Sequence, residues 1–129
     1  MKRFFYFLCA MCMMVLFASC TNTPTSAVES YLDHYKNGEY KAMVDEMYFK
    51  KNMTDKDKAE LVQLLEDKAD ETIEKKGKIS HYQINSEVYS ADSLTATVKY
   101  TLVYGNGDTE DEKAKVVKVN DKWMVDSNK

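Results

Sequence analysis

The stretch LTATVKYTLVY, residues 94–104, alternates apolar and polar side chains over most of its length. A period of two is typical of a β-strand that has one face buried and one face in water. The segment before it, residues 82–88, has the same period, and turn-forming residues follow at 105–108 and 120–121. The C-terminal half of the chain is therefore predicted to form a four-stranded antiparallel meander with one apolar face.

Upstream of these strands the apolar residues recur every three to four positions, which predicts three helices. The first begins at the Ser-x-x-Glu spacing of a capping box, and the third begins at a threonine followed by acidic residues. The helices are expected at residues 26–37, 39–49 and 54–77. Because a sheet with one apolar face needs a cover, we predict an α+β fold with three N-terminal helices packed on the sheet.

Four segments carry a resemblance to a known family: residues 24–32, KNGEYKAM at 36–43, the long helix up to Gly77, and NDKWMVD at 120–126. Together they resemble the α+β cone of the nuclear-transport-factor-two-like (NTF2-like) superfamily. More narrowly, they are similar to the small uncharacterised lipoproteins of anaerobic gut bacteria that contain such a domain. The resemblance implies a strongly bent sheet wrapped around a helix, with a cavity at one end. It implies no single activity, because isomerases, dehydratases, transport factors and binding modules share this scaffold.

The N-terminus has the organisation of a secretion signal. Lys2 and Arg3 precede an unbroken apolar run of 14 residues, 4–17, and small residues follow at 18–19. At about 1.5 Å per residue such a helix reaches roughly 21 Å, which is short of the roughly 30 Å hydrocarbon core of a bilayer. A permanent membrane-spanning helix is therefore disfavoured.

The segment LFASC, residues 16–20, resembles the lipobox of bacterial lipoproteins. The resemblance implies that the Cys20 sulfur is acylated and that cleavage makes Cys20 the new N-terminus; the alternative is an ordinary signal peptide with an incidental cysteine. We thus predict a lipoprotein signal peptide at 1–19, a lipidated cysteine and tether at 20–25, and a single α+β domain at 26–129. No acidic residue lies between Cys20 and Glu29, which favours a cell-envelope location on the periplasmic side of the outer membrane.

Charge and composition argue against several classes of partner. Removal of Lys2 and Arg3 with the leader changes the formal net charge from −3 to −5, which disfavours binding to nucleic acid. Two separate histidines and no thiol left free in the mature chain do not make a zinc site of the usual kind. The acidic run at residues 106–112 lacks the full spacing of a calcium loop. We expect neither a metal nor a cofactor.

Catalysis on such a scaffold would require an acid or a histidine on the apolar side of the sheet. The apolar faces of the first two expected strands contain neither. His34 and Asp33 lie off the apolar centre of the first helix, and His81 is expected to share the wet strand face with Glu87. Asn106, Asp108, Glu110 and Glu112 are interpreted as a charged hairpin tip.

Tyrosine dominates the aromatic residues outside the leader, and its apolar ring with a polar tip suits the wall of a half-wet cavity. The same residues could equally form a filled core. The expected pocket lining consists of Tyr31, Tyr35, Tyr82, Tyr100, Tyr104 and Trp123.

The favoured interpretation is a lipid-anchored binding or interaction domain of the cell envelope without catalytic activity. Its partners would be the membrane, through the lipid anchor, and a small amphipathic or sugar-like ligand or an envelope protein. One alternative is a small isomerase- or hydratase-type enzyme that uses the cone cavity. Another is a structural subunit that pairs as a homodimer through its sheet.

Overall fold

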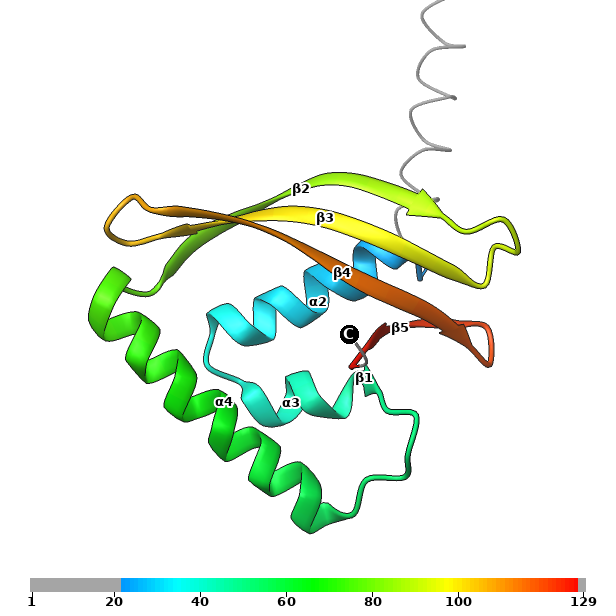
Figure 1. The fold of residues 1–129 in the computed structure, drawn as a ribbon, viewed down its shortest axis with the longest axis horizontal. Coiled ribbons are helices and arrows are strands. Elements are labelled where there is room, and N and C mark those ends of the chain that lie inside the picture. The colour runs from blue at the N-terminus through cyan, green and yellow to red at the C-terminus, as the bar shows by residue number, and fades with distance from the viewer. Residues whose placement is uncertain (1–21, 128–129) are drawn as a thin grey trace, which may run out of the picture.

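The computed structural model describes residues 22–127, so the predicted leader and Cys20 lie outside the described part of the chain. The fold is α+β, as predicted, with the helices preceding the main strands (Figure 1). The elements in chain order are α2 (Pro24–Lys36), α3 (Tyr40–Asp45), β1 (Met47–Tyr48), α4 (Asp55–Lys76), β2 (Ile79–Tyr89), β3 (Thr95–Tyr104), β4 (Thr109–Val119) and β5 (Lys122–Asp126).

The described strands form one mixed sheet of five strands in the order β1-β5-β4-β3-β2. The four long strands pair antiparallel, as the alternation predicts. The prediction of four strands missed β1, which pairs parallel to β5 with Met47 opposite Val125. A two-residue strand has no readable period, and its pairing partner lies far along the chain. The second helix accordingly ends at Asp45 and does not reach residue 49.

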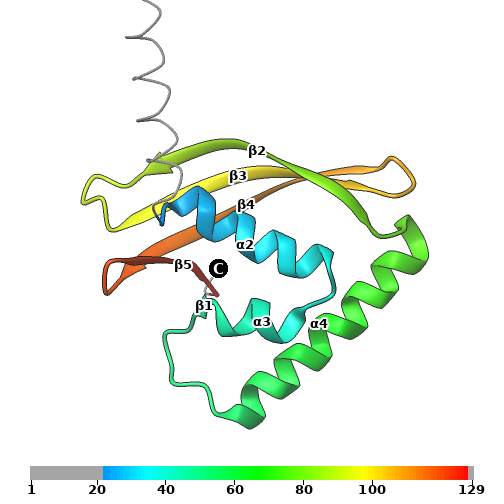
Figure 2. The ribbon, with the colours of Figure 1, turned by 180° about the vertical axis from the view of Figure 1, so that it is seen from behind.

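Helix α2 lies in the concave face of the bent sheet, where both ribbon views show it enclosed by β2, β3 and β4 (Figures 1 and 2). Its buried residues are Pro24, Val28 and Leu32, on one face at helical spacing. Val28 and Leu32 pack on buried sheet residues that share the concave side, which are Ala96, Val98, Tyr100, Leu102, Tyr104, Ala114, Val116, Trp123 and Val125.

The start of α2 differs from the prediction. Thr23 is the N-cap, and its side chain accepts from the Ser26 amide while the Ser26 hydroxyl accepts from the Thr23 amide, at 3.1 and 2.7 Å. Pro24 occupies the first helical turn, where its missing N–H costs no hydrogen bond. The capping box is therefore Thr23–Ser26 and not Ser26–Glu29, and the segment predicted as tether ends inside the folded domain.

Helix α4 is the exception to the predicted packing of all three helices on the sheet. It lies against α3 on the outside of the molecule and meets the sheet at its C-terminal end (Figures 1 and 2). Only Ala69 is buried among its described residues, and Leu64 is 66% exposed. Its ends are well formed: Thr54 and Asp57 make a reciprocal capping box, and Lys75 contacts Glu71 at 2.7 Å. Interactions within the helix and at its ends therefore contribute much of the stability of α4.

A bulge in β2 reverses the side-chain direction of its second half. The register shifts between Ile84 and Ser86, after which Glu87 lies opposite Val98, a fully buried concave residue. Residues directly opposite on antiparallel strands share a face, so Glu87 points inward and Val88 outward. The expectation that Glu87 shares the wet face with His81 is therefore wrong.

A cleft at the C-terminal end of α2

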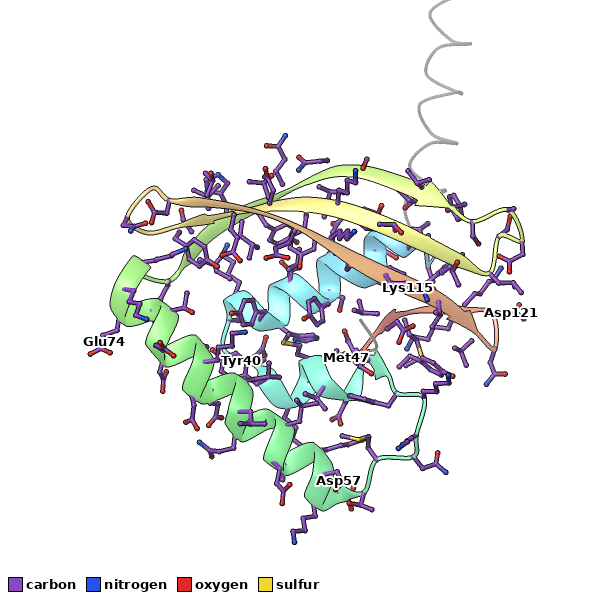
Figure 3. The ribbon with its side chains drawn as sticks, viewed as in Figure 1. Tyr40, Met47, Asp57, Glu74, Lys115 and Asp121 are labelled. Carbon is purple, nitrogen blue, oxygen red and sulfur yellow. The ribbon has the colours of Figure 1, made fainter. Side chains whose placement is uncertain are left out.

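The concave face is not filled along its whole length. A cleft of about 310 Å³ remains between the last turn of α2, the start of α3, the second half of α4 and the neighbouring ends of β2 and β3. Its walls include Tyr35, Tyr40, Asp70, Ile73, Ile79 and Tyr104. Figure 3 shows Tyr40 in the space between the helices at this end of the molecule. The volume lies at the lower end of the range for pockets that bind small molecules.

Aromatic rings form much of the wall. Tyr35 of α2 and Tyr40 of α3 meet edge to face, with ring centroids 6.1 Å apart and planes inclined by 62°. Tyr104 at the end of β3 forms the sheet side of the cleft. Burial raises the pKa of Tyr35 and of Tyr40, so both hydroxyls are neutral donors and acceptors at physiological pH.

Behind Tyr104 lies a polar group that fixes its ring. The Tyr104 hydroxyl donates to a Glu110 carboxylate oxygen at 2.9 Å, and burial together with this bond raises the tyrosine pKa. The Lys76 ammonium lies 5.1 Å from the Tyr104 ring centroid and 3.8 Å from Glu110. An ammonium, an aromatic face and a carboxylate thus already meet at this edge of the cleft.

Backbone contacts hold the cleft end together where α4 meets the β3–β4 hairpin. The Gly105 amide donates to the Lys78 carbonyl at 2.7 Å, and the Asn106 amide donates to the Lys76 carbonyl at 2.9 Å. Gly77 has φ of +84°, and a Cβ at this position would lie 3.3 Å from the Gly105 Cα. Only glycine meets both demands without strain.

A second group of polar side chains continues from the cleft along β4. Glu112 lies opposite Tyr100, and Glu110 lies opposite Leu102, so both carboxyls are on the concave side of the sheet. Hydrogen bonds with Glu112 and from Tyr104 keep the pKa of Glu110 below its usual range, although burial acts in the opposite direction. The interpretation of Glu110 and Glu112 as a hairpin tip is therefore wrong. The tip consists of residues 105–108, since β4 begins at Thr109.

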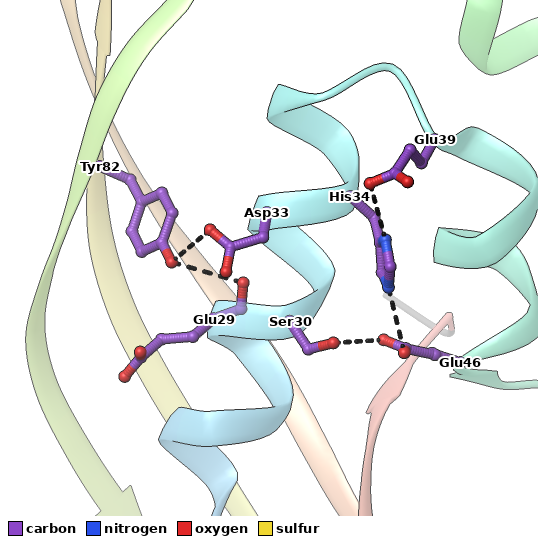
Figure 4. Close-up of polar contacts among 7 residues, drawn as sticks. All are labelled: Glu29, Ser30, Asp33, His34, Glu39, Glu46 and Tyr82. Carbon is purple, nitrogen blue, oxygen red and sulfur yellow. Dashed lines mark hydrogen bonds and ion pairs between the residues drawn. The ribbon is translucent and has the colours of Figure 1, made fainter.

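The opposite flank of α2 is closed by hydrogen bonds (Figure 4). The Tyr82 hydroxyl donates to Asp33 at 2.8 Å, and burial together with this bond raises the tyrosine pKa. On the α3 side, the two ring nitrogens of His34 contact Glu39 at 3.3 Å and Glu46 at 3.1 Å. Burial disfavours the charged imidazole, but the bonds to Glu46 and Glu39 outweigh it, and the pKa of His34 is raised above 6.5.

Comparison with known proteins identifies the family and the fold of this chain. Residues 17–126 match the model of a family described as "Domain of unknown function (DUF4878)". The chain belongs to this family. No curated protein matches the chain in sequence. A crystal structure of a Campylobacter jejuni protein, named as a candidate NTF2-like transpeptidase, is similar with a TM-score of 0.67 and 14% sequence identity over 82% of this chain and 99% of that chain. The likeness establishes that this DUF4878 domain has an NTF2-like fold.

The six predicted pocket residues lie at four places in this DUF4878 domain. Tyr35 and Tyr104 line the cleft. Tyr31 and Tyr100 lie deeper, beside Glu112. Burial is the main cause that raises both pKa values, that of Tyr31 to about 12. Tyr82 faces the other flank of α2, and Trp123 lies against Tyr89 at the far end of the sheet.

Sequence reasoning missed Glu110, Asp70 and Lys76 as neighbours of the cleft. The signal for Glu110 was present, because Glu110, Glu112, Ala114 and Val116 continue the two-residue period of a strand. Asp70 and Lys76 belong to a helix whose packing partner the pattern does not specify. Within residues 22–127, no three metal-ligating side chains gather, and no helix has the length and apolar character needed to cross a bilayer.

Proposed function

We propose that this protein is a non-catalytic, lipid-anchored binding domain of the cell envelope that takes a small amphipathic or sugar-like ligand in the cleft. The observation that carries the proposal is the cleft itself, with about 310 Å³ of space between tyrosine rings. Ring faces suit the apolar face of a sugar or an aromatic group, and tyrosine hydroxyls suit its polar edge.

The charges around the cleft favour a ligand without a large net charge. Lys36 and Lys78 border the cleft together with Asp70, and the Lys76 ammonium beside Tyr104 is paired with Glu110. Because both signs are represented, neither an anion nor a cation gains a strong advantage. Hydrogen bonding and stacking would therefore supply most of the specificity.

A transpeptidase activity, suggested by the name of the Campylobacter jejuni protein, has little support from the side chains of this chain. Such chemistry needs an activated nucleophile, and residues 22–127 contain no cysteine. Ser30 donates to Glu46 at 2.8 Å, and Glu46 also contacts His34, so the carboxylate lies between the hydroxyl and the imidazole. This order does not let the histidine act as base toward the serine.

The inward carboxyl of Glu110 does not favour the isomerase or hydratase alternative either. A general base works best with a pKa near the operating pH, whereas the pKa of Glu110 is held below its usual range. Glu110 is better suited to orient Tyr104 than to accept a substrate proton.

The anchor is the second part of the proposal. Acyl groups on Cys20 would hold the domain to the membrane, since each buried methylene contributes about 0.8 kcal/mol. Intact-mass spectrometry of protein purified from native membranes tests this part directly. Acylation predicts a chain that begins at Cys20 and carries the added mass of fatty chains, whereas an unmodified thiol at Cys20 would refute the anchor. Ligand binding is tested separately, because a chain without its leader contains the whole cleft.

A further inference from the structure

The end of the sheet opposite the cleft exposes apolar side chains around the β2–β3 hairpin. Val88 is 60% exposed, Tyr89 47% and Leu94 55%, and these are three of the five most exposed large apolar residues in the described chain. Tyr89 ends β2, Leu94 is the last residue of the five-residue connection to β3, and Val88 immediately precedes Tyr89. We refer to residues 88–94 as the hairpin end.

The start of the described chain is fixed to the same end. The Trp123 amide of β5 donates to the Asn22 side-chain oxygen at 2.5 Å. The Thr25 amide and hydroxyl both donate to Glu87, the residue before Val88. In Figures 1 and 2 the first turn of α2, the β2–β3 hairpin and the β4–β5 turn all lie at one end of the molecule.

This fixed start limits how far a lipid anchor at Cys20 could lie from the hairpin end. Cys20 precedes Asn22 by two residues, and an extended chain spans at most about 3.6 Å per residue, so the Cys20 backbone lies within about 7 Å of Asn22, which is itself bonded to Trp123. A bilayer that holds acyl chains on Cys20 must therefore lie close to this end of the domain.

We propose that the hairpin end is a membrane-contacting surface, with Val88 and Leu94 inserted at the lipid headgroup level and Tyr89 at the interface. The proposal rests on the anchor at Cys20. Exposed aliphatic residues beside an exposed tyrosine are side chains that suit the boundary between headgroups and acyl chains.

The polar groups of the hairpin end are compatible with this contact. Asp92 is the only charged residue in the 88–94 segment. Its carboxylate accepts from the Ser90 hydroxyl and the Leu94 amide, so it serves the turn itself. The surface has no cluster of basic residues within this segment, and a zwitterionic lipid such as phosphatidylcholine is the lipid chemistry to which we commit.

The contact would orient the cleft. Helix α2 has 13 residues, and at about 1.5 Å per residue it separates the hairpin end from the cleft by about 20 Å. With the hairpin end on the bilayer, the cleft faces away from the membrane, where a water-borne ligand can enter it.

Trp123 provides a native probe because it is the only tryptophan in the chain and packs on Tyr89 with ring centroids 5.7 Å apart. The experiment places the acylated protein in vesicles of phosphatidylcholine with brominated acyl chains, which quench a nearby indole. We expect the Trp123 fluorescence to be quenched relative to vesicles without bromine. Combining Val88→Asp with Leu94→Asp should leave the protein on the vesicles and reduce the quenching by about twofold or more, because a charge resists insertion.

Leu64→Asp is the control, since it places an aspartate at an exposed leucine of α4, away from the hairpin end, and it should leave the quenching unchanged. Unquenched Trp123 in vesicle-bound protein would overturn the proposal, as would equal quenching in the doubly substituted protein. Self-association of the anchored protein that shields Trp123 from bromine would likewise overturn it in favour of a second copy.

The outcome can be separated from failure of the anchor. If mass spectrometry finds Cys20 unmodified, the chain beginning at Cys20 has a single thiol, which couples to a maleimide lipid in the same vesicles. Quenching that depends on Val88 and Leu94 in that sample would support the contact surface even though the natural anchor is refuted. Absence of quenching there would overturn the surface independently of acylation.

Discussion

The two ends of the concave sheet face show how one sheet can provide both a core and a site. At the end near the start of α2, small sheet residues such as Val98 and Val116 are fully buried and let Val28 pack closely. At the other end, Tyr104 with Glu110 behind it occupies the sheet, and a cleft of about 310 Å³ remains. Small aliphatic side chains allow close packing, whereas large rings tied to polar partners hold the elements apart. Stability is therefore expected to depend on the first end and recognition on the second.

The largest effect is expected from a truncation in the filled core. Leu32→Ala removes a buried α2 side chain, and we expect the free energy of unfolding to fall by about 3 kcal/mol because a cavity is left behind. Leu64→Ala on the exposed face of α4 is the control and should change it by less than about 0.5 kcal/mol. Urea denaturation monitored by Trp123 fluorescence measures both. Similar losses for the two variants would mean that α4 is as tightly packed as α2.

The next effect concerns the backbone clamp at the cleft end. Gly77→Ala forces an L-residue into φ of +84° and brings its Cβ to 3.3 Å from Gly105, and we expect a loss of about 2 kcal/mol. Gly38→Ala also has positive φ but meets nothing within 4 Å, so its loss should be smaller. Amide hydrogen exchange of residues 104–106 should rise more in Gly77→Ala than in Gly38→Ala. Equal behaviour would show that strain at Gly77 matters and its close approach to the hairpin does not.

A smaller, pH-dependent effect is expected at the filled end from Glu87. Burial would raise its pKa, but hydrogen bonds from Thr25 at the start of α2 outweigh burial and lower it. Because the pKa of Glu87 is lower in the folded state, the group stabilises the fold at pH values above its ordinary pKa of 4.5. This stability is lost as the pH falls through the folded pKa. Glu87→Gln should therefore reduce stability at pH 7 by about 0.5 to 1 kcal/mol and flatten its decline in acid. Denaturation midpoints between pH 2 and pH 7 test this, and parallel curves for the two proteins would contradict it.

The smallest effect is expected at His34, which joins α2 to α3 near the cleft end. Because the pKa of His34 is raised in the folded state, the group stabilises the fold fully at pH values below its ordinary pKa of 6.5. This stability is lost as the pH rises through the folded pKa. Because the pairs with Glu39 and Glu46 are partly solvated, we expect His34→Asn to cost about 0.5 kcal/mol or less at pH 5.5. The cost should be smaller still at pH 8.5. An NMR titration of the His34 ring that gives a pKa below 6.5 would contradict the network.

Local pattern predicted much of the fold. The alternation around Val98 predicted strand β3, and the capping signals at Thr54 and Gly77 predicted the two ends of α4. Each signal lies in or next to the element that it predicts, and the structure confirms both. What the pattern could not predict depends on distant partners. Strand β1 forms because Met47 meets Val125. Helix α4 packs on α3, which packs on α2, and only α2 packs broadly on the sheet.

The candidate site was predicted only in part, because local pattern identifies some of its residues and not others. Tyr35 and Tyr104 were found because each lies on the apolar face of a regular element. Glu87 was assigned to the wrong face because a bulge reverses β2. Glu110 was assigned to the hairpin tip, although it belongs to β4, which begins at Thr109. A one-residue change of register moves a side chain from one face of a sheet to the other, and sequence does not reveal bulges reliably.

The most direct test of the central claim is a titration of the ¹⁵N-labelled chain with phenyl β-glucoside, an aromatic ring joined to a neutral sugar, monitored by amide NMR shifts. We expect the shifted amides to surround the cleft, near Tyr35, Ala69, Ile79 and Tyr104. Tyr104→Ala should abolish the shifts, whereas Tyr82→Ala, on the other flank of α2, should preserve them. Shifts that appear elsewhere, or that persist in Tyr104→Ala, would contradict the assignment of the cleft as the binding site.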